Sequence, residues 1–208
     1  MEVARKYFNC SDLDGVALEE YGGSGTVNSH WEARILLGDY MNGYIYPEEQ
    51  VISEFTLALL EDSGNYKAYY YTGGLMRYGK NKGCSFVRGD CVNRTTQRIE
   101  PKFENEFFDN IYSGNDYDSS CSSGRQSRTY FYFSNYYNLS ESYSYFNDKG
   151  QGGYAPADYC PVAIGIGGYG AYAYYSYQCS EKGLANMAIS SVTYLEMVFL
   201  HLPKVMRN

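Results

Sequence analysis

The chain of 208 residues is short of the residues and motifs on which many metal sites are built. It has two histidines, His30 and His201, a single tryptophan, and no His-Glu-x-x-His motif. A catalytic zinc ion needs three protein ligands, and that motif usually supplies two of them from one helix face. A site of three histidines within these residues is therefore excluded. No Cys-x-x-Cys pair is present either, which argues against a structural zinc site built on cysteines.

The marks of several other protein classes are also missing. No apolar run approaches the roughly 20 residues of a membrane-spanning helix. The first ten residues, MEVARKYFNC, contain no apolar signal core. A serine-nucleophile elbow of the Gly-x-Ser-x-Gly type is absent. The net charge is −7, and lysines and arginines form no run longer than two, which argues against a nucleic-acid partner.

The residues in excess are tyrosine and glycine, with 26 and 22 copies. This composition favours strands and loops over a helical bundle, and the alternating run at residues 128–133 predicts a short strand. The clearest helix pattern covers residues 47–62, with a proline and acidic residues at its start and Gly64 as its stop. Residues 1–8 predict the end of another helix, which Asn9 stops.

Six cysteines at wide and irregular spacing predict a disulfide framework. A nucleophilic cysteine would need a nearby histidine and a lowered pKa, and an even, dispersed set fits disulfides better. Cys84 and Cys91 bracket a short loop that a local bridge would close. Three Asn-x-Ser/Thr triplets, which begin at Asn9, Asn93 and Asn138, favour a secretory route. The candidate disulfide cysteines are Cys10, Cys84, Cys91, Cys121, Cys160 and Cys179.

The residue patterns by themselves leave the function open. A lone histidine in a polar loop, such as His30, is more often structural than a metal ligand. A pair of carboxylates for sugar hydrolysis leaves no sequence signature, so that reaction stays open. The tyrosine-rich stretch is either a recognition surface or the filling of a strand-rich body, and the second is the more common case.

One stretch says more than its composition. Residues 22–43 read GGSGTVNSHWEARILLGDYMNG and place His30 eleven residues before Met41, which lies in a Tyr-Met-Asn-Gly turn. This stretch resembles the leishmanolysin family of zinc metalloendopeptidases. The similarity covers about residues 2–180 and is strongest over residues 8–86. The other motifs that carry it are FNC at 8–10, GVALE at 15–19, YPEEQVISEFTLALLEDSGNYKA at 46–68, GGLMRYGKNKGCSF at 73–86 and DYCPV at 158–162.

The resemblance implies a site as well as a family. Leishmanolysin-type peptidases are metzincin-like, disulfide-rich, and secreted or anchored at cell surfaces. They have a His-Glu-x-x-His helix, a long insertion, a third histidine and a methionine turn. By resemblance, His30 is the third ligand of Zn²⁺ and Met41 lies beneath the metal. The cysteines that the resemblance implies to be bridged are Cys10, Cys84, Cys91 and Cys160.

We therefore expect an α+β fold, the C-terminal portion of a metzincin-like peptidase followed by a disulfide-rich domain of strands and loops. Residues 1–83 are expected to carry the third zinc ligand and the methionine turn. Residues 84–190 form the expected domain rich in cysteine and tyrosine. Residues 191–208 have an apolar helical pattern that departs from the family and form an atypical tail.

The resemblance also implies parts that these residues do not contain. The His-Glu-x-x-His helix, with two ligands and the catalytic glutamate, is expected N-terminal to residue 1, together with a leader. We expect a zinc metalloendopeptidase by descent that cleaves proteins or peptides, is secreted or membrane-associated when intact, and is inactive as these residues alone. The alternatives are a non-catalytic adhesion or binding remnant at the cell surface, or a helix supplied by another chain.

Overall fold

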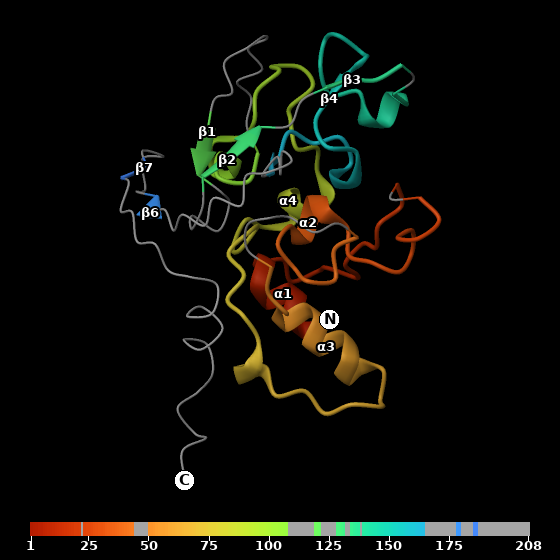
Figure 1. Cartoon of the computed structure of the whole chain (residues 1–208), viewed down its shortest axis with the longest axis vertical. Coiled ribbons are helices and arrows are strands. Elements are labelled where there is room, and N and C mark those ends of the chain that lie inside the picture. Colours follow the sequence, from red (N-terminus) through yellow and green to blue (C-terminus); the bar gives the residue numbers. More distant parts are fainter. Residues whose placement is uncertain are drawn as a thin grey trace, which may run out of the picture.

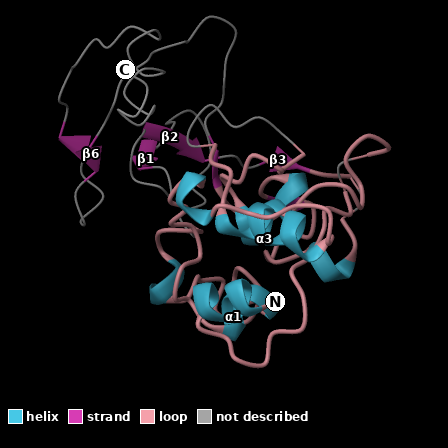
Figure 2. Ribbon diagram, turned by 90° about the horizontal axis from the view of Figure 1, so that it is seen from below, coloured by secondary structure: helices cyan, strands magenta, loops and turns pink. Residues whose placement is uncertain are grey.

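The computed structural model describes residues 1–21, 23–43, 50–107, 119–121, 128–131, 134–137, 139–164, 178–179 and 185–186. Within these ranges, short helices and short strands are joined by long loops, which gives a mixed α and β composition (Figure 1). Figure 2 shows most of the helices in the lower part of the view, and the strands β1 and β2 above them. The expected tail at residues 191–208 lies outside the described residues.

Two helices near the N-terminal end of the chain lie side by side (Figure 1). Helix α1 covers Glu2–Phe8 and ends at Asn9, whose left-handed backbone (φ 57°) closes the last turn. Helix α3 covers Glu54–Asp62. The ring of Tyr7 meets that of Phe55 edge-on, with 4.8 Å between centroids, so an aromatic contact joins the two helices. The predicted helix end at residues 1–8 is confirmed.

The predicted helix at residues 47–62 is right at its end and wrong at its start. Gly64 follows the last turn with a φ of 74°, as a helix stop should. At the other end, the Ser53 hydroxyl accepts a hydrogen bond from the Phe55 N–H and caps the helix there. Val51 lies in an isolated bridge with Asp39 instead of a helical turn. The serine cap, and not the proline, therefore sets the start.

The remaining helices are single turns or slightly longer. Helix α2 follows the segment that contains His30, and helix α4 begins at Cys84, the second cysteine of the chain. The bounds are Ala33–Leu36 for α2, Cys84–Arg88 for α4, Tyr70–Thr72 for η1, Pro101–Phe103 for η2, Glu141–Tyr143 for η3 and Ala155–Ala157 for η4.

The described strands are short and antiparallel. Three of them form one sheet in the order β1-β2-β5, and two further pairs, β3-β4 and β6-β7, stand apart from it. The strand predicted from the alternating run at residues 128–133 is confirmed by β2. The bounds are Ser119–Cys121 for β1, Arg128–Phe131 for β2, Ser134–Asn135 for β3, Gln151–Gly152 for β4, Ala163–Ile164 for β5, Gln178–Cys179 for β6 and Ala185–Asn186 for β7.

The hydrophobic core draws on both sides of residue 83, where a domain boundary is expected. Phe8 from α1 and Phe86 from α4 are both buried, and their rings lie 6.0 Å apart. Phe86 also stacks on Phe107 at 5.6 Å. The division at residue 83 stays a prediction, and the described residues around it are packed into one cluster.

Two disulfides close long loops of the chain. Cys10 is bonded to Cys84, 74 positions away, and Cys91 to Cys160, 69 positions away. The local bridge between Cys84 and Cys91 that the sequence left open is therefore wrong, because each of these cysteines has a distant partner. Cys121 and Cys179 lie in β1 and β6, and their side chains are outside the described part of the structure.

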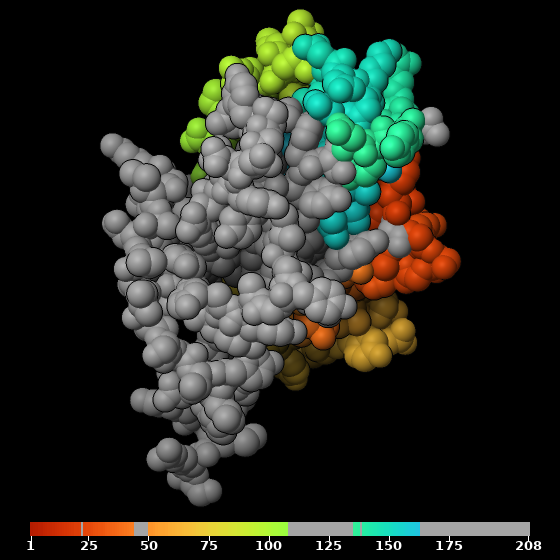
Figure 3. Space-filling model, turned by 45° about the horizontal axis from the view of Figure 1, so that its top comes forward, coloured from red at the N-terminus to blue at the C-terminus, as the bar shows by residue number. Residues whose placement is uncertain are grey.

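The loop that precedes His30 contacts the second half of the chain at the surface. Figure 3 shows the residues coloured red to orange beside the green-to-cyan residues of the second half. The Tyr143 hydroxyl donates to the Glu20 carboxylate at 2.5 Å, and the rings of Tyr21 and Tyr143 lie 4.9 Å apart. The loop with the candidate ligand is thus supported by residues more than 100 positions further along the chain.

Candidate functional site

His30 lies in a short segment that hydrogen bonds hold from both sides. On one side, the Glu19 N–H donates to the carbonyl of His30 at 2.9 Å. On the other side, the N–H of the next residue, Trp31, donates to the carbonyl of Met41 at 2.9 Å. The backbone that carries His30 is therefore fixed between two segments that come before and after it in the sequence.

The imidazole of His30 has a defined orientation. Its Nδ1 lies 3.2 Å from the carbonyl oxygen of Thr26 and 2.9 Å from the hydroxyl of Ser29. The Ser29 hydroxyl fits either role, but a carbonyl oxygen can only accept, so a hydrogen bond to Thr26 requires the tautomer with the hydrogen on Nδ1 and the lone pair on Nε2. A carbonyl partner on the second ring nitrogen is typical of histidines that bind metals. This tautomer of the half-buried His30 is the one that a zinc ligand needs.

Met41 lies in a turn that is tied directly to the segment of His30. Its side chain is partly buried against the hydrophobic core. The carboxamide of the next residue, Asn42, donates to the Trp31 carbonyl at 3.2 Å and accepts from the Gly38 N–H at 3.1 Å. Together with the bond from Trp31 to Met41, these contacts bring the backbones of the predicted ligand segment and the predicted methionine turn together.

A buried aspartate, Asp39, organises the same turn, and the sequence did not single it out. Its side chain is fully buried, and one carboxylate oxygen accepts the Met41 N–H at 2.7 Å. The other oxygen accepts from Ser53 at the start of α3. Its partners lie up to 17 positions away and follow no helical or strand period, so its burial leaves no pattern in the sequence.

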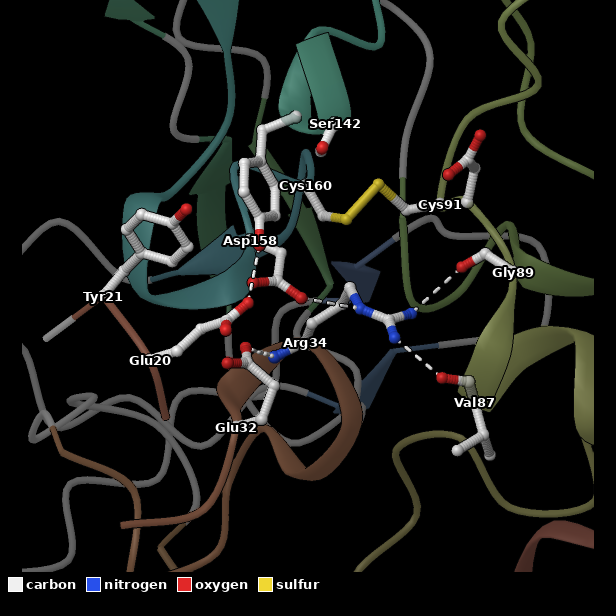
Figure 4. Close-up of polar contacts among 12 residues, drawn as sticks. Glu20, Tyr21, Glu32, Arg34, Val87, Gly89, Cys91, Ser142, Asp158 and Cys160 are labelled. Carbon is white, nitrogen blue, oxygen red and sulfur yellow. Dashed lines mark hydrogen bonds and ion pairs between the residues drawn. A yellow bond between two sulfur atoms is a disulfide. The ribbon is translucent and has the colours of Figure 1, made fainter. Parts of the chain in front are cut away.

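The ionisable side chains of Glu32, Arg34 and Asp158 form a cluster, in which Glu32 is buried and the other two are half-buried (Figure 4). The guanidinium of Arg34 pairs with Asp158 at 3.1 Å and donates to the carbonyls of Val87 at 2.7 Å and Gly89 at 3.2 Å. Arg34 thereby satisfies carbonyls at the end of α4 that no helical partner reaches. The motif with Asp158 at its start is thus joined to the His30 segment.

Burial changes the proton affinity of the carboxyl groups in this cluster. Burial, with the nearby charge of Asp158 adding to it, raises the pKa of Glu32 to about 9, so this side chain is neutral near pH 7. Burial also raises the pKa of Asp158, although the guanidinium of Arg34 opposes the change. One oxygen of Glu32 accepts the N–H of Arg34 at 2.9 Å and caps α2.

No second histidine joins His30 in the described part of the chain. There, three ligand-type atoms come within reach of one another at Cys10, Asp12 and Cys84, but the two sulfurs are bonded to each other. A disulfide sulfur is no thiolate, so this group does not bind zinc. His30 is therefore the one histidine among the described residues, and no group of metal-binding side chains forms around it there. None of the described helices has the length and apolar character to cross a membrane.

Comparisons with known proteins establish the class and then the family. Residues 1–192 match the family model described as Leishmanolysin. The chain is 46% identical over 88 residues to a leishmanolysin-like peptidase of Drosophila pseudoobscura pseudoobscura, which is 42% of this chain and 13% of that protein. It is 32% identical over 163 residues to a leishmanolysin homolog of Crithidia fasciculata, and 29% identical over 169 residues to leishmanolysin of Leishmania tropica.

The last two alignments cover 77% and 78% of this chain, and each covers 23% of the relative. These matches place the chain among the metallopeptidases. More narrowly, it belongs to the leishmanolysin family, and it spans less than a quarter of the length of these relatives. The family that the sequence resembles is confirmed, and the roles of His30 and Met41 stay predictions.

Proposed function

We propose that this chain is part of a leishmanolysin-type zinc metalloendopeptidase, in which His30 is one of the zinc ligands. The observation that carries the proposal is the contact between His30 Nδ1 and the Thr26 carbonyl, because it leaves Nε2 available to a metal. Zinc at such a site polarises the scissile carbonyl and lowers the pKa of a bound water. The turn of Met41 supports the backbone of the ligand segment.

We propose that the other ligands come from residues outside these 208, since the second histidine, His201, begins no zinc motif. We place the missing ligands and the general-base glutamate in a His-Glu-x-x-His helix. The expected metzincin-like fold belongs to the same proposal. Without that helix, one imidazole does not hold zinc firmly, and nothing accepts the proton of the attacking water. The 208 residues alone are therefore proposed to be inactive.

The substrates that fit this proposal are proteins or peptides, and the location that fits it is outside the cell or at its surface. The disulfides are consistent with an oxidising compartment. Two of the candidate glycosylation sites, Asn9 and Asn93, are exposed. Asn138 lies outside the described residues.

The test compares this chain with a product that also carries a His-Glu-x-x-His segment, fused in sequence or mixed in as a second polypeptide. Zinc is measured by elemental analysis, and cleavage of casein is measured with and without a chelator. We expect stoichiometric zinc and chelator-sensitive cleavage only when the segment is present. Stoichiometric zinc or chelator-sensitive cleavage with the 208 residues alone would contradict the proposed inactivity.

A pair of histidine variants of that product tests the role of His30. His30→Ala is expected to remove both the zinc and the cleavage, because it removes a ligand. His201→Ala is the matched control and is expected to keep both. If His30→Ala retains zinc and activity, His30 is not a ligand. A folded product with no zinc-dependent activity under any of these conditions favours the alternative of a non-catalytic binding remnant.

A further inference from the structure

Asp39 has no exposed surface, yet both oxygens of its side chain are hydrogen-bonded. Oδ1 accepts hydrogen bonds from the Met41 N–H at 2.7 Å and from the Thr56 hydroxyl at 2.8 Å. Oδ2 accepts the Ser53 N–H at 3.2 Å and also the Ser53 hydroxyl. Four donors from three residues therefore converge on one carboxylate, which is an arrangement that only an acceptor with two oxygens can serve.

Two routes lead from this carboxylate to the residue next to His30. Along the backbone, Met41 donates its N–H to Asp39 and accepts the N–H of Trp31 at its carbonyl, at 2.9 Å. Along the side chains, the Thr56 hydroxyl donates to Asp39 and accepts the indole N–H of Trp31, also at 2.9 Å. Trp31 is thus held at its backbone and at its ring by groups that Asp39 orients.

The carboxylate also joins the methionine turn to α3. Ser53 caps the first turn of that helix by accepting the Phe55 N–H at 3.2 Å, and Ser53 is itself held by Asp39. The helix gives Asp39 a rigid base. The turn of Met41 and the ring of Trp31 are therefore fixed relative to a folded element, and so is the backbone from which the His30 imidazole projects.

We propose that Asp39 is a positioning residue for His30, an inference that rests on the proposed role of His30 as a zinc ligand. Asp39 does not touch the metal. It fixes the turn of Met41 and the ring of Trp31, and through them it keeps the His30 backbone where Nδ1 reaches Thr26 and Nε2 faces away from that bond. Outer residues that orient a ligand typically change metal affinity about 10- to 100-fold when they are removed.

The composition of the chain supplies two direct reporters. Trp31 is the single tryptophan, and His30 and His201 are the two histidines. The nitrogen chemical shifts of the imidazoles, measured by NMR, give the tautomer of His30 with His201 as an internal reference. The indole fluorescence and the indole N–H signal report on Trp31. Both measurements use the 208-residue chain without metal.

Asp39→Asn is the main variant, because its amide turns two donors toward groups that are donors themselves. We expect the wild-type His30 to show the Nδ1–H tautomer, and D39N to show a mixture of tautomers with a red-shifted tryptophan emission. Thr56→Val breaks the side-chain route alone and is expected to give a smaller change in the same direction. Asp148→Asn, at an exposed turn, is the matched control and is expected to change neither signal.

A purely structural role for Asp39 predicts a different pattern. In that case D39N lowers the unfolding midpoint, but the imidazole and indole signals of the folded fraction stay as in the wild type, and the proposal is overturned. If D39N does not fold, Thr56→Val is the deciding variant. Imidazole signals of His30 that match the wild type in Thr56→Val then overturn the proposal.

The zinc measurement separates this inference from the proposed function. In the product that carries a His-Glu-x-x-His segment, D39N is expected to weaken zinc binding by about tenfold, the lower end of the range for outer-shell residues. Loss of zinc in His30→Ala with unchanged affinity in D39N overturns the positioning role only. Retention of zinc in His30→Ala overturns the ligand role, whatever the NMR signals of D39N show.

Discussion

At the scale of single residues, three buried or half-buried polar side chains in the described part of the chain serve backbone groups. Arg34 donates to carbonyls at the end of α4, Glu32 accepts an N–H at the start of α2, and Asp39 accepts two backbone N–H groups. A buried polar group destabilises a protein unless it is bonded, so these side chains and the backbone satisfy one another. The candidate ligand His30 precedes all three of them in the sequence, by two to nine positions.

The neutral state of Glu32 makes the stability of the chain depend on pH. Its pKa in the folded state is about 9, against an ordinary value of 4.5. Between pH 4.5 and pH 9 the folded state holds a proton on Glu32 that the unfolded state has lost. The contribution of Glu32 to the free energy of unfolding therefore decreases as the pH rises. The limiting slope is about 1.4 kcal/mol per pH unit. Urea denaturation from pH 5 to pH 9 is expected to show this decline in the wild type.

Glu32→Gln removes the titrating proton while keeping an oxygen that can cap α2. We expect the variant to have a flatter stability profile over the same pH range and to be the more stable protein at the alkaline end. Glu104→Gln, an exposed glutamate, is the matched control and is expected to keep the wild-type slope. An unchanged slope in Glu32→Gln would show that this carboxyl is charged in the folded state.

Removing Arg34 is expected to be far more damaging than removing an exposed arginine. Arg34→Met leaves the half-buried carboxylate of Asp158 and the carbonyls of α4 without their donor. Breaking one side of a buried pair costs about 3–5 kcal/mol. Arg88→Met breaks an exposed pair with Asp12 and is expected to leave the unfolding midpoint close to that of the wild type. Equal midpoints of urea denaturation for the two variants would contradict the role given to Arg34.

At the scale of elements, the sequence patterns predicted the helix ends that local residues determine. The end of α1 at Asn9 and the end of α3 before Gly64 follow from residues that favour a left-handed backbone. The start of α3 was missed because two helix-start signals compete, a proline with acidic residues and a serine further on. Ser53 prevails because Asp39 holds its hydroxyl and N–H, which is a tertiary contact.

Only the residues of the candidate site that belong to its sequence motif could be predicted. His30 and Met41 stand eleven residues apart in a recognisable stretch, so the resemblance finds them. Asp39 and Arg34 are ordinary residues in sequence, and their roles come from partners that folding brings near. The pair of Arg34 and Asp158 spans 124 positions, and no local period records such a contact.

The cap of α3 gives a test at this scale. Ser53→Ala removes the acceptor of the Phe55 N–H and is expected to cost about 1–2 kcal/mol. Ser63→Ala, at the exposed C-terminal end of the same helix, is expected to stay within about 0.5 kcal/mol of the wild type. Thermal unfolding followed by circular dichroism compares the two. Equal losses would mean that the helix does not begin where the structure has it.

At the scale of the whole molecule, one core and two disulfides unite segments that are distant in sequence. Phe8 and Phe86 meet in the core, and Cys10 and Cys84 are bonded beside them. The second bridge ties Cys91 to Cys160, the cysteine of the motif that contains Asp158. The elements on either side of the His30 segment therefore depend on covalent links as well as on packing.

The bridge between Cys91 and Cys160 is expected to contribute strongly to stability. It closes a loop of 69 positions, and in the chain-entropy description a loop of that size stabilises the folded state by about 4 kcal/mol. A double variant, Cys91→Ser with Cys160→Ser, should lower the midpoint of urea denaturation under oxidising conditions. An oxidised double variant as stable as the wild type would contradict this.

The order of the two bridges along the chain has a mechanical consequence. The loop from Cys10 to Cys84 ends before the loop from Cys91 to Cys160 begins. The two covalent rings are therefore consecutive along the chain and do not overlap. A pulling force applied at the two ends of the chain is carried by each disulfide bond, and the residues between its two cysteines bear none of it. About 500 Å of contour length is thereby shielded from extension, at roughly 3.5 Å per residue, until a reductant opens the rings. The helices α1, α2 and α3 begin in or just before the first ring, and α4 begins at the cysteine that closes it.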